Sequence, residues 1–193
     1  MLQPFLQLKN VSKAFQGRGV VTDFSLSLEP EERVCLMGPS GSGKTTLLRL
    51  LCGLEEPDSG ERIARPGLRF AMVFQENRLI ESLDALGNVS LCCRCSPEAV
   101  RECLLALDLP EDRLTCPVWE FSGGMKRRVA LARALLAPSD VLLLDEPYKG
   151  LDEDTRVRVM AQVENRLAGR GLVLVTHDPR EQGDCRVVRV GED

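Results

Sequence analysis

Hydrophobic and polar residues alternate along two segments near the start of the chain, residues 6–15 and 20–28. A period of two places apolar side chains on one face of a strand, as in half-exposed antiparallel strands. The apolar run RVCLM follows at 33–37 and ends at Gly38. The first part of the chain is therefore expected to be rich in β-structure.

The rest of the chain alternates between helical and strand patterns. Apolar residues recur at helical spacing in three segments, and three apolar runs predict strands. The helical segments are 44–52, the basic stretch between Gly124 and Pro138, and 153–168; the apolar runs are 70–74, 141–144 and 172–175. The run VLLL at 141–144 is apolar throughout, which is typical of a strand buried on both faces of a parallel sheet. Alternating strands and helices predict an α/β core.

Residues from about 77 to 118 follow a different pattern. Ser96 and Pro97 predict a helix start, with serine as the N-cap and proline in the first turn, and apolar residues follow on one face. We expect a small helical lobe with irregular connections. The predicted organisation is one domain over residues 1–193, in which 1–76 and 126–193 form the α/β core with a β subdomain and about 77–125 form the helical lobe.

Composition and charge narrow the possible functions. Of the 193 residues, 44% are hydrophobic and 28% charged, as in ordinary globular proteins. The formal net charge of −4 argues against a nucleic-acid-binding protein, which is normally basic. No apolar run approaches the ~20 residues that span a bilayer, and the polar start is no signal peptide. We expect a cytoplasmic protein that reaches a membrane only through a partner.

Eight cysteines are scattered along the chain, and the densest group is Cys92, Cys93 and Cys95, with Cys103 further on. Cys92 and Cys95 have C-x-x-C spacing but no second C-x-x-C pair accompanies them, and the one histidine of the sequence is remote from this group. The group therefore favours reduced thiols in a reducing compartment over a metal or redox site.

The segment GPSGSGKTT at 38–46 matches the phosphate-loop pattern G-x-x-x-x-G-K-[ST], with a predicted strand before it and a helix after it. Glycines allow successive backbone N–H groups to point at a phosphate, and the helix N-terminus adds a positive dipole end. Lys44 is expected to reach the β- and γ-phosphates and the Thr45 hydroxyl to bind Mg²⁺. The predicted ATP-binding residues are Gly38, Pro39, Ser40, Gly41, Ser42, Gly43, Lys44, Thr45 and Thr46.

Two adjacent carboxylates, Asp145 and Glu146, follow the predicted buried strand at 141–144. An Asp-Glu pair in this place could simply cap a helix or start a turn. Together with a phosphate loop it favours ATP hydrolysis, with Asp145 in the magnesium shell and Glu146 accepting the proton of the attacking water. Adjacent side chains on a strand point to opposite faces, so we expect the two carboxylates to have different roles.

Gln75 and His177 also follow predicted strands. Taken alone, each is more simply a surface or structural residue. Ligands of parallel α/β sheets gather at the carboxyl ends of the strands, however. Gly38, Gln75, Asp145 and His177 all lie at such ends, so the sequence predicts that they converge on one γ-phosphate.

With these segments in this order, the chain resembles the nucleotide-binding subunits of ATP-binding-cassette (ABC) transporters. The matching motifs are the phosphate loop at 38–46, Gln75 as the Q-loop, FSGGM at 121–125 as the signature, LLLDEP at 142–147 as Walker B, 150–152 as the D-loop and His177 as the switch histidine. The segments QENRL at 75–79, NV at 88–89 and DEPYKGLD at 145–152 are most similar to bacterial importers of nitrate, taurine and aliphatic sulfonates. The resemblance implies a RecA-like P-loop ATPase core, an antiparallel β subdomain and a small helical lobe.

The resemblance also implies a head-to-tail dimer that holds two ATP molecules between its chains. Each site would combine the phosphate loop of one chain with Ser122, Gly123 and Gly124 of the other, with Asp152 at the same interface. Phe15 matches the aromatic residue that stacks on adenine; packing in the protein core is its alternative role.

The resemblance implies that Gln75 links magnesium and the attacking water to the helical lobe, and that His177 contacts the γ-phosphate. Lys44, Gln75, Glu146 and His177 are thus the expected catalytic residues, and Thr45, Gln75 and Asp145 the expected magnesium ligands. The lobe would receive a helix of a membrane permease, and an extracytoplasmic substrate-binding protein would complete the importer.

The signature departs from the LSGGQ that is usual in the family, because Phe121 and Met125 replace leucine and glutamine. Two other classes remain open. A soluble ABC-type ATPase, such as those in DNA repair or those associated with the ribosome, usually has coiled coils, zinc modules or tandem cassettes. The sequence has no pattern typical of these features. A P-loop kinase for a small molecule would need neither Ser-Gly-Gly nor the switch histidine.

Overall fold

The computed structural model describes residues 5–191 and contains two sheets, of which the smaller is antiparallel. The alternating segments form strands as predicted, β1 (Leu6–Phe15) and β2 (Arg18–Leu28), and the two pair antiparallel with each other. A third strand, β4 (Ser59–Ala64), pairs with the other edge of β1. The sequence pattern did not predict β4, because its residues are mostly polar and none is fully buried.

The larger sheet is parallel and has the strand order β5-β6-β7-β3-β8. Its strands are β3 (Arg33–Met37), β5 (Phe70–Val73), β6 (Val141–Asp145), β7 (Gly171–Val175) and β8 (Arg186–Arg189). Every residue of β6 and β7 is buried, which confirms the prediction of a strand covered on both faces. The edge strand β8 was not predicted, since only two apolar residues stand between its arginines.

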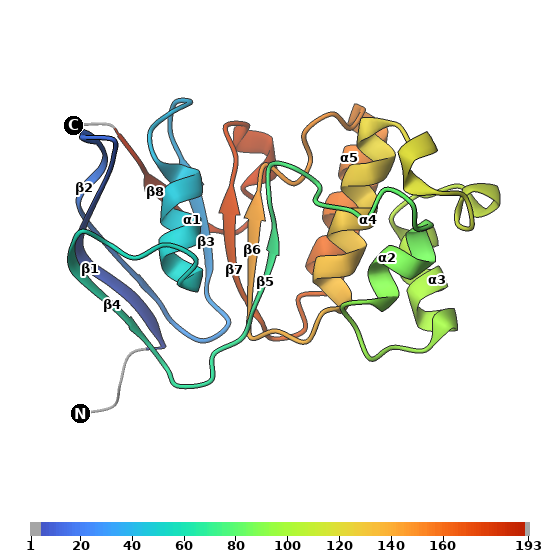
Figure 1. Cartoon of the computed structure of the whole chain (residues 1–193), viewed down its shortest axis with the longest axis horizontal. Helices are drawn as coiled ribbons and strands as arrows, with labels where there is room; N and C mark the ends of the chain where they lie inside the picture. The colour runs from blue at the N-terminus through green and yellow to red at the C-terminus, as the bar shows by residue number, and fades with distance from the viewer. Residues whose placement is uncertain (1–4, 192–193) are drawn as a thin grey trace.

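The parallel sheet separates two hydrophobic cores. Side chains on one face, such as Leu36, Leu143 and Val173, pack against α1 (Lys44–Cys52) and the antiparallel sheet. Their sequence neighbours on the other face, such as Cys35, Leu144 and Leu172, pack against the helices beyond. Those helices are α4 (Gly123–Leu136) and α5 (Glu153–Asn165), and a 3₁₀ turn at Pro179–Glu181 follows β7. The strands and helices thus form layers, with α1 between the two sheets (Figure 1).

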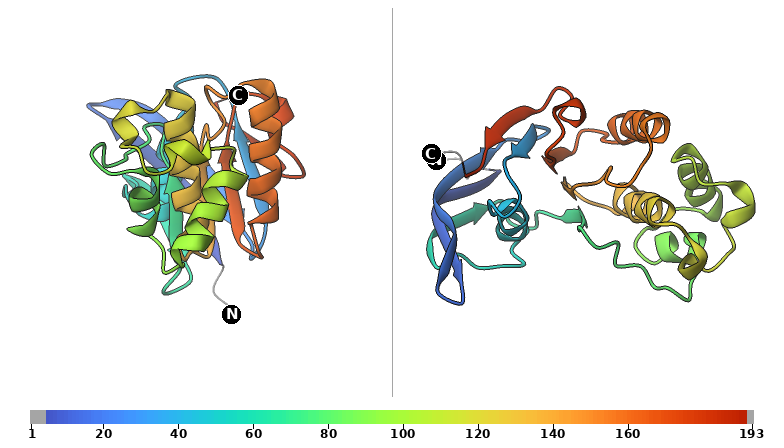
Figure 2. Two further views of the ribbon diagram at one scale, coloured as in Figure 1. Left: turned by 90° about the vertical axis from the view of Figure 1, so that its right-hand side faces the viewer. Right: turned by 90° about the horizontal axis from the view of Figure 1, so that it is seen from above.

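A group of short helices lies at the end of the molecule opposite the antiparallel sheet (Figure 2). It consists of α2 (Ala85–Ser90), α3 (Pro97–Ala106) and 3₁₀ turns at Glu111–Arg113 and Val118–Glu120. The Ser96 hydroxyl accepts a hydrogen bond from the Ala99 N–H, which confirms the predicted N-cap of α3. The unpredicted helix α2 is only six residues long and is capped by Asp84.

The helices in residues 5–191 are short, and the longest, α4, has 14 residues. None of the helices in this range is both long and apolar enough to cross a membrane.

Candidate functional site

The carboxyl ends of four neighbouring parallel strands bring most of the predicted site residues together. Strand β3 leads into Gly38, β6 ends at Asp145, and Gln75 and His177 come shortly after β5 and β7. A cavity of about 270 Å³ opens at these ends. It is lined by Val20, Ser40, Gly41, Gly43, Lys44, Thr45, Thr46, Gln75, Glu146 and Val175.

The backbone of the phosphate loop needs glycine at two places. Gly38 and Gly43 have φ values of +158° and +92°, and a Cβ would lie 2.2 Å from Val190 O at Gly38 and 2.7 Å from Val20 O at Gly43. The space beside Gly41 is open. Helix α1 begins at Lys44, within the last part of the loop motif, and no side chain caps its N-terminus. The loop therefore presents free N–H groups and a positive helix end to the cavity, as an anion-binding site requires.

The Lys44 side chain folds back over this loop. Its Nζ donates hydrogen bonds to Gly38 O at 2.8 Å and Pro39 O at 2.6 Å. Burial lowers the pKa of Lys44, and the negative charges of Glu146 and Asp145 oppose that effect. The ammonium group is thus held at the mouth of the loop, close to both carboxylates.

Thr45 and Asp145 form the pair that fits a magnesium ion. The Thr45 hydroxyl donates to Asp145 Oδ2 at 2.7 Å. Asp145 is fully buried, and its Oδ1 has no hydrogen-bond partner among the described residues. Burial raises the pKa of Asp145, while the bond from Thr45 opposes the rise. One hydroxyl and one carboxylate are enough here, because Mg²⁺ usually takes its other ligands from water and substrate phosphates.

Glu146 comes directly after β6 and has a left-handed backbone with φ of +48°. Its N–H donates to Val175 O at 2.9 Å. Lys149 Nζ donates to Glu146 Oε2 at 2.7 Å, and Nδ1 of His177 lies 3.7 Å from Oε1. Burial alone would raise the pKa of Glu146, but the bond from Lys149 and the nearby positive charges outweigh it and lower the pKa. The carboxylate is therefore ionised and faces the cavity.

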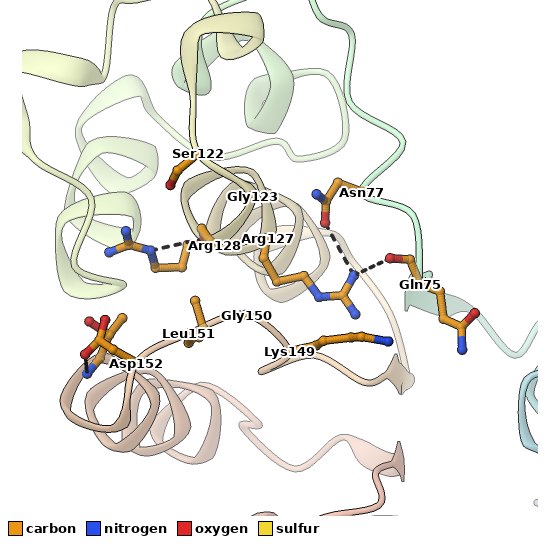
Figure 3. A pocket seen from close by; sticks show the side chains of 12 residues that line it. Gln75, Asn77, Ser122, Gly123, Arg127, Arg128, Lys149, Gly150, Leu151 and Asp152 are labelled. Carbon is orange, nitrogen blue, oxygen red and sulfur yellow. Dashed lines mark hydrogen bonds between the residues drawn. The ribbon is translucent and has the colours of Figure 1, made fainter. Parts of the chain in front are cut away.

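A second cavity of about 500 Å³ lies beside the N-terminus of α4 (Figure 3). Its lining comprises Gln75, Asn77, Ser122, Gly123, Gly124, Arg127, Arg128, Lys149, Gly150, Leu151, Asp152 and Thr155. The Ser122 hydroxyl accepts a hydrogen bond from the Met125 N–H at 3.2 Å and so caps α4. Gln75 lines both cavities, whereas Ser122–Gly124 and the phosphate loop line different ones.

The other signature residues are placed by packing. A Cβ on Gly124 would lie 3.2 Å from Gly150 O, while the space beside Gly123 is open. Met125, which replaces the usual glutamine, packs against the hydrophobic core next to α4. The Asp152 carboxylate accepts from the Thr155 N–H at 2.9 Å and caps α5.

Phe15 is 40% exposed at the end of β1, with Lys13 Nζ 5.5 Å from its ring centroid. This exposure argues against the alternative of core packing. Phe15 lines neither of the two cavities. The Phe15 ring is thus accessible from solvent.

Cys92 and Cys95 are exposed and Cys93 is half-buried. Within residues 5–191, no group of three or more His, Cys, Asp and Glu side chains could hold a metal ion.

Sequence reasoning missed two residues that touch the site, Lys149 and Arg127. Lys149 binds Glu146 directly. Arg127 is 3% exposed and donates hydrogen bonds to backbone oxygens on both sides of the second cavity, including Gln75 O and Glu146 O. The basic run KRR at 126–128 was the available signal, but a run of charges gives no sign that one of them is buried.

A protein-family model described as ABC transporter matches residues 21–149. The aliphatic sulfonates import ATP-binding protein SsuB 1 of Rhodococcus jostii strain RHA1 is 42% identical over 182 residues, covering 91% of this chain and 74% of the relative. The chain belongs to the ABC transporter family. The taurine import ATP-binding protein TauB of Pseudomonas fluorescens strain Pf-5 is 40% identical over 195 residues, covering 91% of this chain and 73% of the relative.

Solved ABC cassettes share the fold. A dimeric post-hydrolysis structure of the cassette MJ0796 bound to ADP and Pi has a TM-score of 0.85 and 29% sequence identity, covering 96% of this chain and 94% of that one. The predicted P-loop ATPase fold with an antiparallel β-sheet is confirmed. Family membership makes the chain an ATP-binding, ATP-hydrolysing subunit, as the sequence motifs predicted.

Proposed function

We propose that this ABC ATPase hydrolyses ATP at the cavity between the phosphate loop and Glu146, and that it energises a membrane importer. The observation that supports these roles is the gathering of Lys44, the Thr45–Asp145 pair and an ionised Glu146 around one cavity. A phosphate cradle, a metal position and a base are the parts that phosphoryl transfer to water needs.

In this proposal each side chain has one task. Lys44 and the loop N–H groups hold the β- and γ-phosphates, and Glu146 accepts the proton of the attacking water. Magnesium, held by Thr45 and Asp145 with Gln75 nearby, would neutralise charge that develops on the phosphate oxygens. His177 is exposed and close to Glu146, so it is free to turn toward the γ-phosphate and orient the water.

The second cavity supports a shared site. Ser122–Gly124 form an exposed helix N-terminus, yet they line a cavity to which the chain's own phosphate loop does not contribute. The MJ0796 cassette was solved as a dimer. We propose a head-to-tail dimer in which Ser122, Gly123 and Gly124 bind the nucleotide of the other chain, with Asp152 at the interface and Phe15 against adenine.

The helical lobe is the proposed contact with a transmembrane permease. Trp119 and Ile80 are 62% and 48% exposed, and the Trp119 N–H donates to Glu81 O, so both lie beside the segment that follows Gln75. An apolar patch next to the Q-loop suits a permease helix.

The relatives named for sulfonate and taurine import support an importer of small sulfonates. Such a system would include an extracytoplasmic binding protein, with this chain at the cytoplasmic face of the membrane. The relatives named for import also make a soluble cassette ATPase the weaker candidate.

Membrane association distinguishes these two candidates. We expect the chain, expressed in its own cells, to be extracted with detergent in a complex with an integral membrane protein. Trp119→Glu should release it from the membrane fraction while ATP binding to the purified chain stays unchanged, because Trp119 lies outside the phosphate-loop cavity. Val157→Glu, the same type of change at an exposed position of α5, is the matched control. A chain that never fractionates with membranes would contradict the transport role.

A further inference from the structure

Arg127 lies on α4 and carries a charged side chain into the protein interior, where it is 3% exposed. It belongs to the same helix as the Ser122–Gly124 terminus. A buried charge is strongly unfavourable unless its hydrogen-bonding groups are satisfied. The hydrogen bonds of Arg127 therefore fix its side chain and also hold the backbone groups that accept them.

The guanidinium group joins two catalytic segments. On one side Nη1 donates to Phe74 O, to Gln75 O at 3.3 Å and to Asn77 Oδ1 at 3.4 Å. On the other side Nε donates to Pro147 O at 3.2 Å, and Nη2 donates to Asp145 O and to Glu146 O at 2.6 Å. Figure 3 shows the side chain reaching from α4 toward Gln75 and Asn77. All three nitrogens of the planar fork are engaged, and only arginine offers five N–H donors in this geometry.

We propose that Arg127 is a positioning residue of the hydrolytic site, which fixes the backbone of Gln75 and Glu146 relative to each other and to the Ser122–Gly124 terminus of α4. This inference rests on the roles proposed above for Gln75 and Glu146. Arg127 contacts their carbonyl oxygens and leaves both side chains available for water and nucleotide.

The backbone of Glu146 needs such support. A left-handed conformation costs a non-glycine residue roughly 1–2 kcal/mol and persists only where surrounding contacts enforce it. Three bonds do so here: the Glu146 N–H donates to Val175 O, and the Glu146 carbonyl accepts from the Lys149 N–H and from Arg127. Without Arg127, the Glu146 backbone would lose the bond that ties it to α4 and to the Gln75 segment.

The same geometry links the two ends of the proposed dimer site. A helix moves as a rigid unit over one or two turns, so a shift of Ser122–Gly124 against a second chain's nucleotide displaces Arg127 as well. Nucleotide binding at the signature of one chain therefore changes the position of Glu146 in the same chain. The positive charge of Arg127 also opposes the burial that raises the pKa of Asp145.

The test compares turnover with nucleotide affinity in the full chain. Arg127→Ala should lower kcat by about 10²-fold, since small misplacements of catalytic groups have effects of this size, with the Kd for ATP changed by no more than about twofold. Arg127→Lys keeps the charge without the fork and should lose most of the same activity. Guanidinium ions at low concentration should partly restore Arg127→Ala, and ammonium ions should not.

Arg170→Ala is the matched control. Arg170 is half-buried and donates to Leu167 O at 3.0 Å and to Arg166 O, but it precedes β7 and so lies at the end of the sheet away from the site. Its loss should lower the melting temperature with kcat kept. The proposal is overturned if Arg127→Ala and Arg127→Lys keep the turnover of Arg170→Ala, or if their ATP affinity falls as far as kcat. Glu146→Gln, assayed alongside, tests the proposed base separately: unchanged turnover there would refute the role of Glu146 itself.

Discussion

Asp145 and Glu146 are neighbours in sequence, but their carboxylates lie in different surroundings. Asp145 ends β6, is fully buried and binds Thr45, whereas Glu146 turns into a left-handed conformation beside Lys149. The pKa is raised by burial at Asp145 and lowered by positive neighbours, against the effect of burial, at Glu146. Environments that move two pKa values apart suit two different tasks.

The Lys149–Glu146 hydrogen bond should affect how ATP hydrolysis depends on pH. Because Lys149 helps to lower the pKa of Glu146, Lys149→Met should raise that pKa. A base works only when deprotonated, so the acidic limb of the plot of kcat/KM against pH should move to higher pH, while activity on the alkaline plateau is largely kept. Steady-state ATP hydrolysis measured over a pH series checks this.

Lys126→Met is the matched control, since Lys126 pairs with Glu81 in the same way but away from Glu146. Its acidic limb should not move. Glu146→Gln should slow hydrolysis by about 10²–10⁴-fold on the alkaline plateau, the range for loss of a general base, and should have no acidic limb from this carboxylate. An acidic limb unchanged in Lys149→Met would mean that another group sets it.

Site residues could be predicted where the motif that contains them is continuous in sequence. The places of Lys44, Thr45 and Asp145 could be predicted because the phosphate loop and the strand before a carboxylate are continuous in sequence. Thr45 and Asp145, the two residues for which a magnesium role is proposed, are in hydrogen-bond contact. Arg127 and Lys149 could not be predicted, since their partners are set by how α4 and β6 meet. The left-handed turn of Glu146 was also invisible, because an extended strand was the natural continuation of VLLLD.

The N-terminus of α4 has two tasks at the scale of an element. Ser122 caps the helix through the Met125 N–H, and in the proposed dimer the same terminus receives phosphate. Stability and nucleotide binding can be separated by Ser122→Asp, because aspartate is as good an N-cap as serine but carries a negative charge. We expect an unchanged melting temperature and a large loss of ATP hydrolysis.

Two further variants complete this test. Ser122→Ala should lower the free energy of unfolding by about 1 kcal/mol through loss of the cap, and should keep more activity than Ser122→Asp. Ser96→Asp makes the same change at the N-cap of α3, where no nucleotide is expected, and should hydrolyse ATP normally. If Ser122→Asp turns over ATP like Ser96→Asp, the terminus of α4 does not meet phosphate.

Helices and strands could be predicted where burial gives their apolar residues a clear pattern along the sequence. Strands β1, β2, β3 and β6 were read from their apolar patterns, whereas β4 is polar and β8 has only two apolar residues. Both strands add to a sheet edge, where pairing comes from backbone hydrogen bonds rather than from side-chain burial. Helix α5 ends at Asn165 instead of continuing to 168, and Ala168 and Gly169 both have left-handed φ values in the turn that follows it.

At the scale of the whole molecule, the two cavities lie side by side and share Gln75. One holds the phosphate loop and Glu146, and the other holds Ser122–Gly124 and Asp152, with Gln75 between them. Two copies related by a twofold axis can each place their signature over the partner's phosphate loop, which gives two equal composite sites in a closed dimer. A mixture of two differently damaged chains tests this arrangement.

Lys44→Ala removes the phosphate-loop cation, and Ser122→Arg blocks the signature. In a mixed dimer one composite site carries both changes and the other carries neither. Equal amounts of the two inactive variants should therefore regain up to about a quarter of parental ATP hydrolysis, because half of the dimers are mixed and each has one intact site. Mixing either variant with itself gives the baseline.

Hydrolysis could fail in the mixture if both sites must fire together, so binding provides the deciding measurement. With Glu146→Gln added to both variants, ATP should stay bound, and the mixed dimer should retain one ATP where the dimer of Glu146→Gln alone retains two. Size-exclusion chromatography with labelled ATP measures this ratio. Sites contained within single chains would predict something different: the Ser122→Arg chain would bind ATP as a monomer, and adding the Lys44→Ala chain would change neither its size nor its bound nucleotide.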